Sequence, residues 1–175
     1  MRGDMEWGTI PGLVRWAAER YAGAEAVVEG RTRISYGELG ARVERATAAC
    51  LAHGVRAGDR VAIWAPNSLD WMVAALGAVG AGAVLVPLNT RFKGAEAADV
   101  LRRSGARLLF VTGTFLGTSY VASLRRAAAE GAGDGPLPGL PALERVVVLS
   151  DDAPAAFRTW KDFLASGEGI GTTEV

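Results

Sequence analysis

Apolar positions along this chain follow two different periods, one typical of helices and one typical of strands. Apolar residues recur every three to four positions over residues 9–21, which predicts a first helix. Thr9 is placed to cap that helix, and Pro11 falls in its first turn, where a missing N–H costs little. Residues 26–35 contain two short strand-like stretches around Gly30 and predict a hairpin.

A second helix is expected directly after this hairpin. Ser35 and Glu38 have the spacing of a capping box, in which each group satisfies a backbone N–H at the start of a helix. Gly54 is placed to end the helix in a left-handed turn. Beyond it, strands are expected at 60–64, 83–86, 107–111 and 145–149, and helices at 69–79 (capped by Ser68), 93–104, 119–130 and 157–164.

This repeated order of strand and helix predicts the fold class. Residues 60–64 form a continuous apolar stretch, as in parallel strands that are covered on both faces. Right-handed crossovers then give an α/β fold, a doubly wound and mostly parallel sheet flanked by helices, with a short N-terminal hairpin. The segment 131–141 is rich in Gly and Pro and predicts a surface loop.

Composition narrows the class of protein without naming a function. The 175 residues suit one domain, and a formal net charge of zero gives no case for a nucleic-acid partner. One Cys and one His cannot form a disulfide or a typical zinc site, which favours a reducing, cytoplasmic location. The longest apolar stretch, residues 71–88, is interrupted by Gly and Pro, so we expect no membrane span. The N-terminus opens no apolar stretch typical of a secretory signal.

Most of the residues that could carry chemistry have a plainer structural explanation. Gly80 and Gly82 precede a strand, whereas a dinucleotide-binding fingerprint follows one, so a nucleotide-binding oxidoreductase is excluded. Cys50 lies on an apolar helix face and is expected to be a buried, inert thiol. His53 at the end of that helix is expected to serve the terminal carbonyls. The pair Asp151–Asp152 is expected to form a solvated turn and not a metal site.

Arg91 is the strongest candidate for binding a ligand. It follows the strand that Pro87 ends, so it is expected at the carboxyl edge of the sheet, where open α/β folds bind their ligands. The planar guanidinium can hold a phosphate through two hydrogen bonds. The alternative is a surface arginine that pairs with a nearby carboxylate.

Five segments resemble the opening of an adenylate-forming acyl-CoA synthetase of the AMP-binding superfamily. They are Trp7 to Trp16 with Tyr21, Arg33-Ile-Ser-Tyr-Gly-Glu-Leu39, Gly54 to Ser68, Gly77 to Phe92, and Arg102 to Val111. The Leu-Asn-Thr-Arg-Phe stretch and Phe115-Leu-Gly are similar to actinobacterial ligases of the HIP-CoA type, which activate propanoates from steroid-ring degradation. The resemblance covers about residues 9 to 165.

The resemblance implies a two-step reaction in the longer enzyme. A carboxylate attacks the α-phosphate of ATP to give an acyl-adenylate and pyrophosphate, and the thiol of CoA then displaces AMP. The family's phosphate loop, Mg²⁺ ligand and catalytic lysine come later in such enzymes and match no residue of this chain. We therefore expect no catalytic residue, no metal ligand and no cofactor for the chain alone, with ATP, Mg²⁺ and CoA used by the full-length enzyme. Arg91 is implied to contact the phosphate end of CoA.

The resemblance also sets the expected organisation and partners. Residues 1–8 are expected to be a tail, 9–165 the N-terminal subdomain, and 166–175 a loose segment before the phosphate loop. An apolar surface is expected where the rest of the ligase, or a second copy, packs. The alternative function is a non-catalytic binding or assembly module that keeps the ligase scaffold. The acid that the enzyme would activate is left open.

Overall fold

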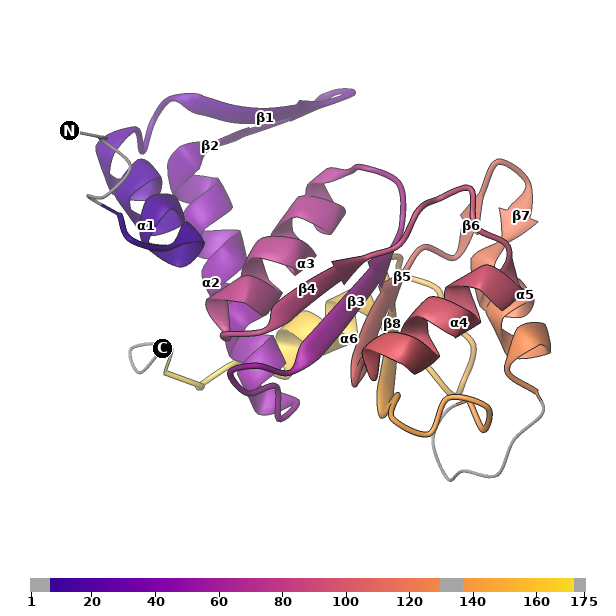
Figure 1. Cartoon of the computed structure of the whole chain (residues 1–175). Helices are drawn as coiled ribbons and strands as arrows, with labels where there is room; N and C mark the ends of the chain where they lie inside the picture. The colour runs from indigo at the N-terminus through magenta and orange to yellow at the C-terminus, as the bar shows by residue number, and fades with distance from the viewer. Residues whose placement is uncertain (1–6, 130–136, 172–175) are drawn as a thin grey trace.

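A central sheet of five parallel strands organises the molecule (Figure 1). The structure, a computed structural model, describes residues 7–129 and 137–171. The sheet has the order β4-β3-β5-β8-β9. Its strands are β3 (Arg60–Trp64), β4 (Val84–Pro87), β5 (Leu108–Val111), β8 (Arg145–Val148) and β9 (Arg158–Thr159).

This strand order fixes where a ligand can approach. The chain leaves β3 toward β4 on one side, then returns to β5 on the other side of β3. The reversal creates a switch point beside β3, and doubly wound sheets bind ligands at the carboxyl ends of such strands. Trp64 is the last residue of β3, so its surroundings belong to this edge.

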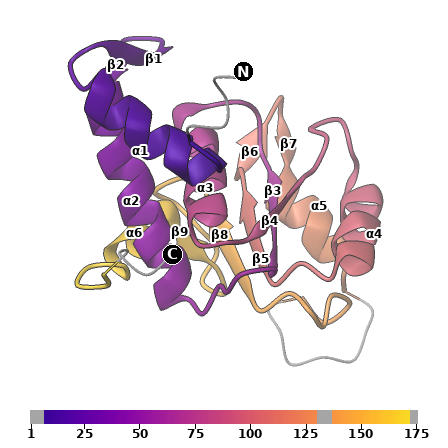
Figure 2. The same ribbon diagram turned by 60° about the vertical axis from the view of Figure 1, so that its left-hand side comes forward.

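Helices cover both faces of the sheet, as the alternation of elements predicted (Figure 2). The helices α2 (Tyr36–Ala52), α3 (Leu69–Gly80) and α6 (Trp160–Ala165) bury one face, and α4 (Gly94–Ser104) and α5 (Tyr120–Ala127) bury the other. Within β3 the side chains alternate between the two cores: Ile63 packs with α2 and α3, and Trp64 packs with α4 and α5. The expected α/β, doubly wound fold is confirmed.

The N-terminal elements lie beside α2 and away from the sheet (Figures 1 and 2). They are α1 (Ile10–Arg20) and the antiparallel hairpin of β1 (Glu25–Glu29) and β2 (Thr32–Ser35). Thr9 caps α1 by accepting from the Gly12 N–H. The capping box is present, because Ser35 Oγ accepts from the Glu38 N–H while Glu38 accepts from the Ser35 N–H.

Short elements account for the differences from the sequence prediction. Two two-residue strands, β6 (Thr114–Phe115) and β7 (Thr118–Ser119), form a hairpin that no periodicity indicated. The last helix starts at Trp160 and not at Phe157, because Thr159 caps it by accepting from the Asp162 N–H. Helix α5 ends at Ala127, and Glu130 lies outside the described residues, as does most of the predicted 131–141 loop.

The start of the segment 166–175 packs against the second helix. A Cβ built on Gly167 would lie 2.5 Å from the Ala49 nitrogen, so the two backbones are in close contact. Residues 172–175, like residues 1–6, lie outside the described part of the chain. The expected domain bounds remain a prediction.

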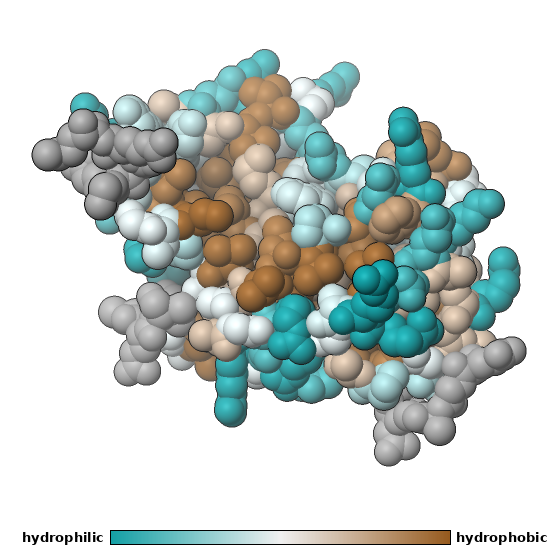
Figure 3. All heavy atoms as spheres, viewed as in Figure 1, coloured by the Kyte–Doolittle hydropathy of each residue, from teal (hydrophilic) through white to brown (hydrophobic). Residues whose placement is uncertain are grey.

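Apolar side chains gather on one outer face, over α3 and β4 (Figure 3). Strand β4 is the edge of the sheet, and its Val84 is 52% exposed. Leu85 and Val86 of the same strand are half-buried. In the described part of the chain, no helix is long and apolar enough to cross a membrane.

Candidate functional site

A cavity of about 630 Å³ surrounds Arg91 at the carboxyl edge of the sheet. It lies between the loop after β4, the first turn of α4, the β6–β7 hairpin and helix α5. Its lining includes three cationic side chains, Arg91, Lys93 and Arg126, and two apolar ones, Phe115 and Leu116. The structure thus places Arg91 where the sequence predicted it, with a hollow in front of it.

Two aromatic side chains fix the loop that presents Arg91. Trp64 is buried at the end of β3, and its Nε1–H donates to the Asn89 carbonyl oxygen at 3.0 Å. The Tyr120 hydroxyl donates to the Thr90 carbonyl oxygen at 2.5 Å, and its ring stacks on Trp64 with centroids 4.2 Å apart. Burial raises the pKa of Tyr120, so the phenol keeps the proton that it donates.

The loop is held from within as well. The Asn89 side-chain oxygen accepts from the Arg91 N–H at 2.9 Å, which closes a tight turn around Thr90. The Phe92 N–H also donates to the Asn89 carbonyl oxygen at 3.0 Å, so the backbone is fixed on both sides of the Arg91 side chain. A site built on such a rigid loop loses little conformational entropy when a ligand binds.

The charge of the cavity is one-sided. Arg91, Lys93 and Arg126 line it, and no Asp or Glu from the described residues does. Among residues 7–129 and 137–171, none of these three side chains has an ion pair or a hydrogen bond. The predicted alternative for Arg91, pairing with a nearby carboxylate, is therefore not realised within that part of the chain. Three unpaired cations around a hollow favour an anionic ligand.

Helix α4 starts at the floor of the cavity and lies very close to α5. Its first residue is Gly94, and a Cβ built there would lie 2.2 Å from the Ser123 carbonyl oxygen. Glu96 accepts from the Lys93 N–H at 2.8 Å and so caps the helix. The absence of a side chain at Gly94 allows α5 to bring Tyr120 and Arg126 to the same cavity as Arg91.

Sequence reasoning found Arg91 but missed the residues around it. Tyr120 and Arg126 come from α5, some thirty residues further along the chain, and neither belongs to a motif. Phe115 and Leu116 belong to a hairpin too short to leave a pattern. The one signal in the sequence was Phe115-Leu-Gly, named above only for its resemblance to the family. In the structure Leu116 is 87% exposed and has a positive φ of 49°.

Cys50 and His53 are structural. Cys50 is fully buried, and burial raises the pKa of its thiol to about 12, so it is not a nucleophile at neutral pH. His53 stacks on Phe163 with ring centroids 4.9 Å apart, and its Nε2 lies 2.9 Å from Ser166 Oγ. His53 does serve a terminal carbonyl of α2, but through its backbone N–H, which donates to the Ala49 carbonyl oxygen at 3.0 Å. Its ring is engaged elsewhere, with Ser166 just after α6.

The remaining candidates also have structural roles. Asp151 and Asp152 are exposed, in a turn after β8. A Cβ on Gly80 would lie 2.3 Å from Thr47 Oγ1, so that glycine permits the close packing of α2 and α3. Within the described residues, no group of three His, Cys, Asp or Glu side chains could hold a metal ion.

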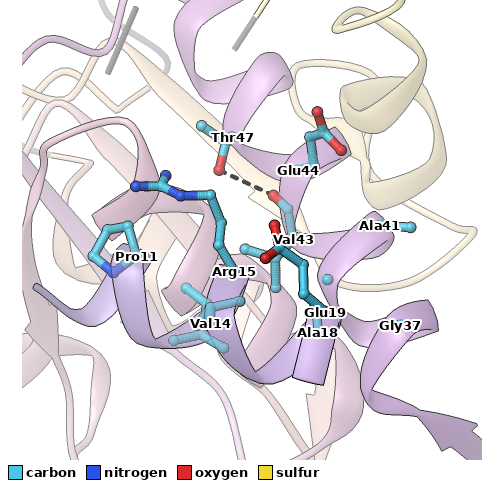
Figure 4. A pocket seen from close by; sticks show the side chains of 13 residues that line it. Pro11, Val14, Arg15, Ala18, Glu19, Gly37, Ala41, Val43, Glu44 and Thr47 are labelled. Carbon is cyan, nitrogen blue, oxygen red and sulfur yellow. Dashed lines mark hydrogen bonds between the residues drawn. The ribbon is translucent and has the colours of Figure 1, made fainter. Parts of the chain in front are cut away.

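A second cavity, of about 640 Å³, lies between α1, α2 and α3 (Figure 4). Arg15 extends into it from α1, and Glu19 and Glu44 also line it. Thr47 Oγ1 in its wall donates to the Val43 carbonyl oxygen. Both signs of charge line this cavity, so it lacks the preference for anions that distinguishes the cavity at Arg91.

Comparison with known proteins identifies the family of this chain. The family model of the AMP-binding enzymes matches residues 14–166. A 3-[(3aS,4S,7aS)-7a-methyl-1,5-dioxo-octahydro-1H-inden-4-yl]propanoyl:CoA ligase of Mycobacterium tuberculosis is 41% identical over 161 residues, and that of Rhodococcus jostii is 42% identical over 159 residues. These alignments cover 92% and 90% of this chain but 29% of each relative, so the chain spans less than a third of their length.

Solved structures agree on the fold. An anthranilate CoA ligase in complex with anthranoyl-AMP superposes with a TM-score of 0.73 at 23% identity, over 94% of this chain and 28% of that one. The N-terminal domain of FACL13 from Mycobacterium tuberculosis gives 0.71 at 24% identity, over 95% and 37%. From its sequence match and its doubly wound architecture, the chain belongs to the AMP-binding enzyme family.

Proposed function

We propose that this chain is the N-terminal portion of an ATP-dependent acyl-CoA ligase, and that Arg91 binds a phosphate of CoA. The observation that carries the proposal is Arg91 itself, which has no ion-pair partner among the described residues and lies in a cationic cavity on a loop that Trp64 and Tyr120 hold. Phosphate oxygens match the planar fork of a guanidinium, and a preorganised fork binds them most tightly.

The substrate class follows from the relatives. Both ligases at 41% and 42% identity carry a name that specifies a propanoyl group on a bicyclic ketone. We propose that the enzyme of this chain activates an acid of the same class, a propanoate attached to fused rings. ATP and CoA are the co-substrates of adenylate-forming ligases, with Mg²⁺ as the typical metal. We assign no Mg²⁺ ligand to the described residues, and we propose a cytoplasmic location because ATP and CoA are the reactants.

A chimeric enzyme tests this function. Residues 14–166 of this chain would replace the matching segment of the Mycobacterium tuberculosis relative. We expect the chimera to form acyl-CoA from the relative's own acid. Arg91→Ala in the chimera should lower kcat/KM for CoA about tenfold, because one charge-assisted phosphate contact is lost. ATP–pyrophosphate exchange, which does not use CoA, should be unchanged.

The isolated chain serves as the control for this experiment. It is expected to give no ATP–pyrophosphate exchange, since the chain supplies less than a third of the relatives' length. A folded chimera that performs neither half-reaction would contradict the proposed function. An Arg91→Ala chimera with unchanged kcat/KM for CoA would remove the role of Arg91 and leave the ligase assignment standing.

The apolar face over α3 and β4 points to a packing partner. We propose that the rest of the ligase covers this apolar face in the full-length enzyme. In the isolated chain, we expect a second copy of the chain to cover it instead. Val84 stands 52% exposed on the open edge of the sheet, where an additional strand could pair. Sedimentation equilibrium of the isolated chain should show self-association that Val84→Lys weakens. If the isolated chain is a monomer at every concentration, a second copy does not cover the apolar face.

A further inference from the structure

The cavity between α1, α2 and α3 has walls that close helix contacts hold in place. A Cβ on Gly40 of α2 would lie 2.6 Å from the Ala18 Cβ of α1, and a Cβ on Gly80 of α3 would lie 2.3 Å from the Thr47 Oγ1 of α2. Helix α2 is therefore in close contact with both of its neighbours, and the hollow of about 640 Å³ remains beside these contacts (Figure 4). A cavity of this size accommodates a small molecule.

Two oppositely charged side chains of α1 line this cavity without neutralising each other. Arg15 and Glu19 are four residues apart, the spacing of an ion pair within a helix. Yet the Arg15 guanidinium points away from the Glu19 carboxylate (Figure 4). Neither side chain has an ion pair or a hydrogen bond within residues 7–129 and 137–171. Glu44 of α2 adds a second carboxylate to the lining. The cavity thus presents a positive group and negative groups at separate places.

The rest of the lining restricts what can satisfy these charges. It includes the apolar side chains of Val14, Val43 and Leu76. A ligand with only an anionic group would leave Glu19 without a partner, and a ligand with only a cationic group would leave Arg15 without one. A molecule with one group of each sign on an apolar chain pairs both, and this is the chemistry that the cavity selects.

We propose that this cavity binds a small aliphatic zwitterion of the amino-acid class, with its carboxylate at Arg15 and its ammonium group at Glu19. The site is independent of the ligase reaction proposed above. It lies with α2 and α3 on one face of the sheet, whereas the cavity at Arg91 lies with α4 and α5 on the other.

Titration of the 175-residue chain with three probes of one chain length tests the proposal. They are ω-aminohexanoate, hexanoate, which lacks the ammonium group, and hexylamine, which lacks the carboxylate, each added up to about 50 mM to cover weak binding. Amide chemical shifts of Gly40 and Gly80 report this cavity, and those of Gly94 report the cavity at Arg91. We expect ω-aminohexanoate to shift Gly40 and Gly80. It should bind there about fivefold more tightly than either other probe, since each of those lacks one partly exposed charge contact.

Matched variants of α1 separate the roles of its charges. Arg15→Gln and Glu19→Gln should each weaken ω-aminohexanoate binding about fivefold. Arg20→Gln is the control, because it removes a positive charge from the same helix. The Arg20 guanidinium lies over the Tyr21 ring, 5.4 Å from its centroid, and Arg20 is not among the described residues that line the cavity. Its replacement should change binding less than about twofold.

The contrary results are equally defined. Hexanoate or hexylamine bound as tightly as ω-aminohexanoate would overturn the preference for a zwitterion, and this comparison needs no variant. Equal effects of Arg15→Gln and Arg20→Gln would overturn the role of Arg15. Unchanged shifts of Gly40 and Gly80 with all three probes would overturn the cavity as a binding site, whether or not Gly94 shifts. The ligase assignment is judged separately, by acyl-CoA formation in the chimera.

Discussion

Replacing Gly94 with alanine is expected to destabilise the protein by about 3 kcal/mol. The new Cβ would lie 2.2 Å from the Ser123 carbonyl oxygen and 2.6 Å from the Ser123 carbonyl carbon. Both are backbone atoms of α5, so no flexible side chain can move aside. Relief requires α4 and α5 to separate, which disturbs the buried contacts of Ala97, Leu101 and Leu124.

Urea denaturation followed by circular dichroism measures this effect. Gly23→Ala is the matched control, because a Cβ there meets nothing within 4 Å and its stability change should stay within about 0.5 kcal/mol. The separation of the helices should also weaken CoA binding, since Gly94 lines the same cavity as Arg91 and Arg126. A Gly94→Ala variant as stable as the Gly23→Ala control would refute the close approach of α4 and α5.

The stability of the protein should fall by about 2 kcal/mol between pH 7 and pH 5 because of His53. Burial, followed by the positive charges of Arg158 and Arg145, lowers the pKa of His53 to about 4. The imidazole therefore stays neutral in the folded state while the unfolded chain binds a proton below about pH 6.5. The unfolded state gains more protons as the pH falls, so stability is lost from about pH 6.5 down to about pH 4.

His53 is the one histidine of the chain, which makes this prediction specific. Histidine is the side chain whose ordinary pKa falls in this pH range. Urea midpoints measured at several pH values should slope for the wild type and lie flat between pH 7 and pH 5 for His53→Gln. The same slope in both proteins would show that burial and the charges of Arg158 and Arg145 do not hold the ring neutral.

The sequence pattern predicted the architecture because the main helices and strands are set by residues that lie close together in the chain. The capping box of Ser35 and Glu38 starts α2 through groups three residues apart, and both hydrogen bonds are present. The apolar run at 60–64 needs cover on both faces, and it became the inner strand β3. The left-handed turn at Gly54, with φ of 78°, could also be predicted from the sequence, since only glycine adopts this conformation at no steric cost.

The two-residue strands could not be predicted from the sequence, because two residues are too few to show a hydrophobic periodicity. The strands β6, β7 and β9 are defined by what they pair with, and their partners are set by the tertiary fold. Phe157 looked helical from its spacing, yet it is buried with the α4–α5 core while the helix begins three residues later, at Trp160. Burial on the opposite face of the sheet decided its place.

The candidate site shows the same division. The sequence by itself determined the doubly wound fold, the family resemblance and the position of Arg91 at the carboxyl edge of the sheet, because these depend on neighbours in the chain. The tertiary structure alone decided that Tyr120 would tether the Arg91 loop and that Arg126 would face the same cavity. The reason is geometric: α5 reaches Arg91 only because Gly94 lets two helices meet backbone to backbone, a contact between segments about thirty residues apart that no local pattern records.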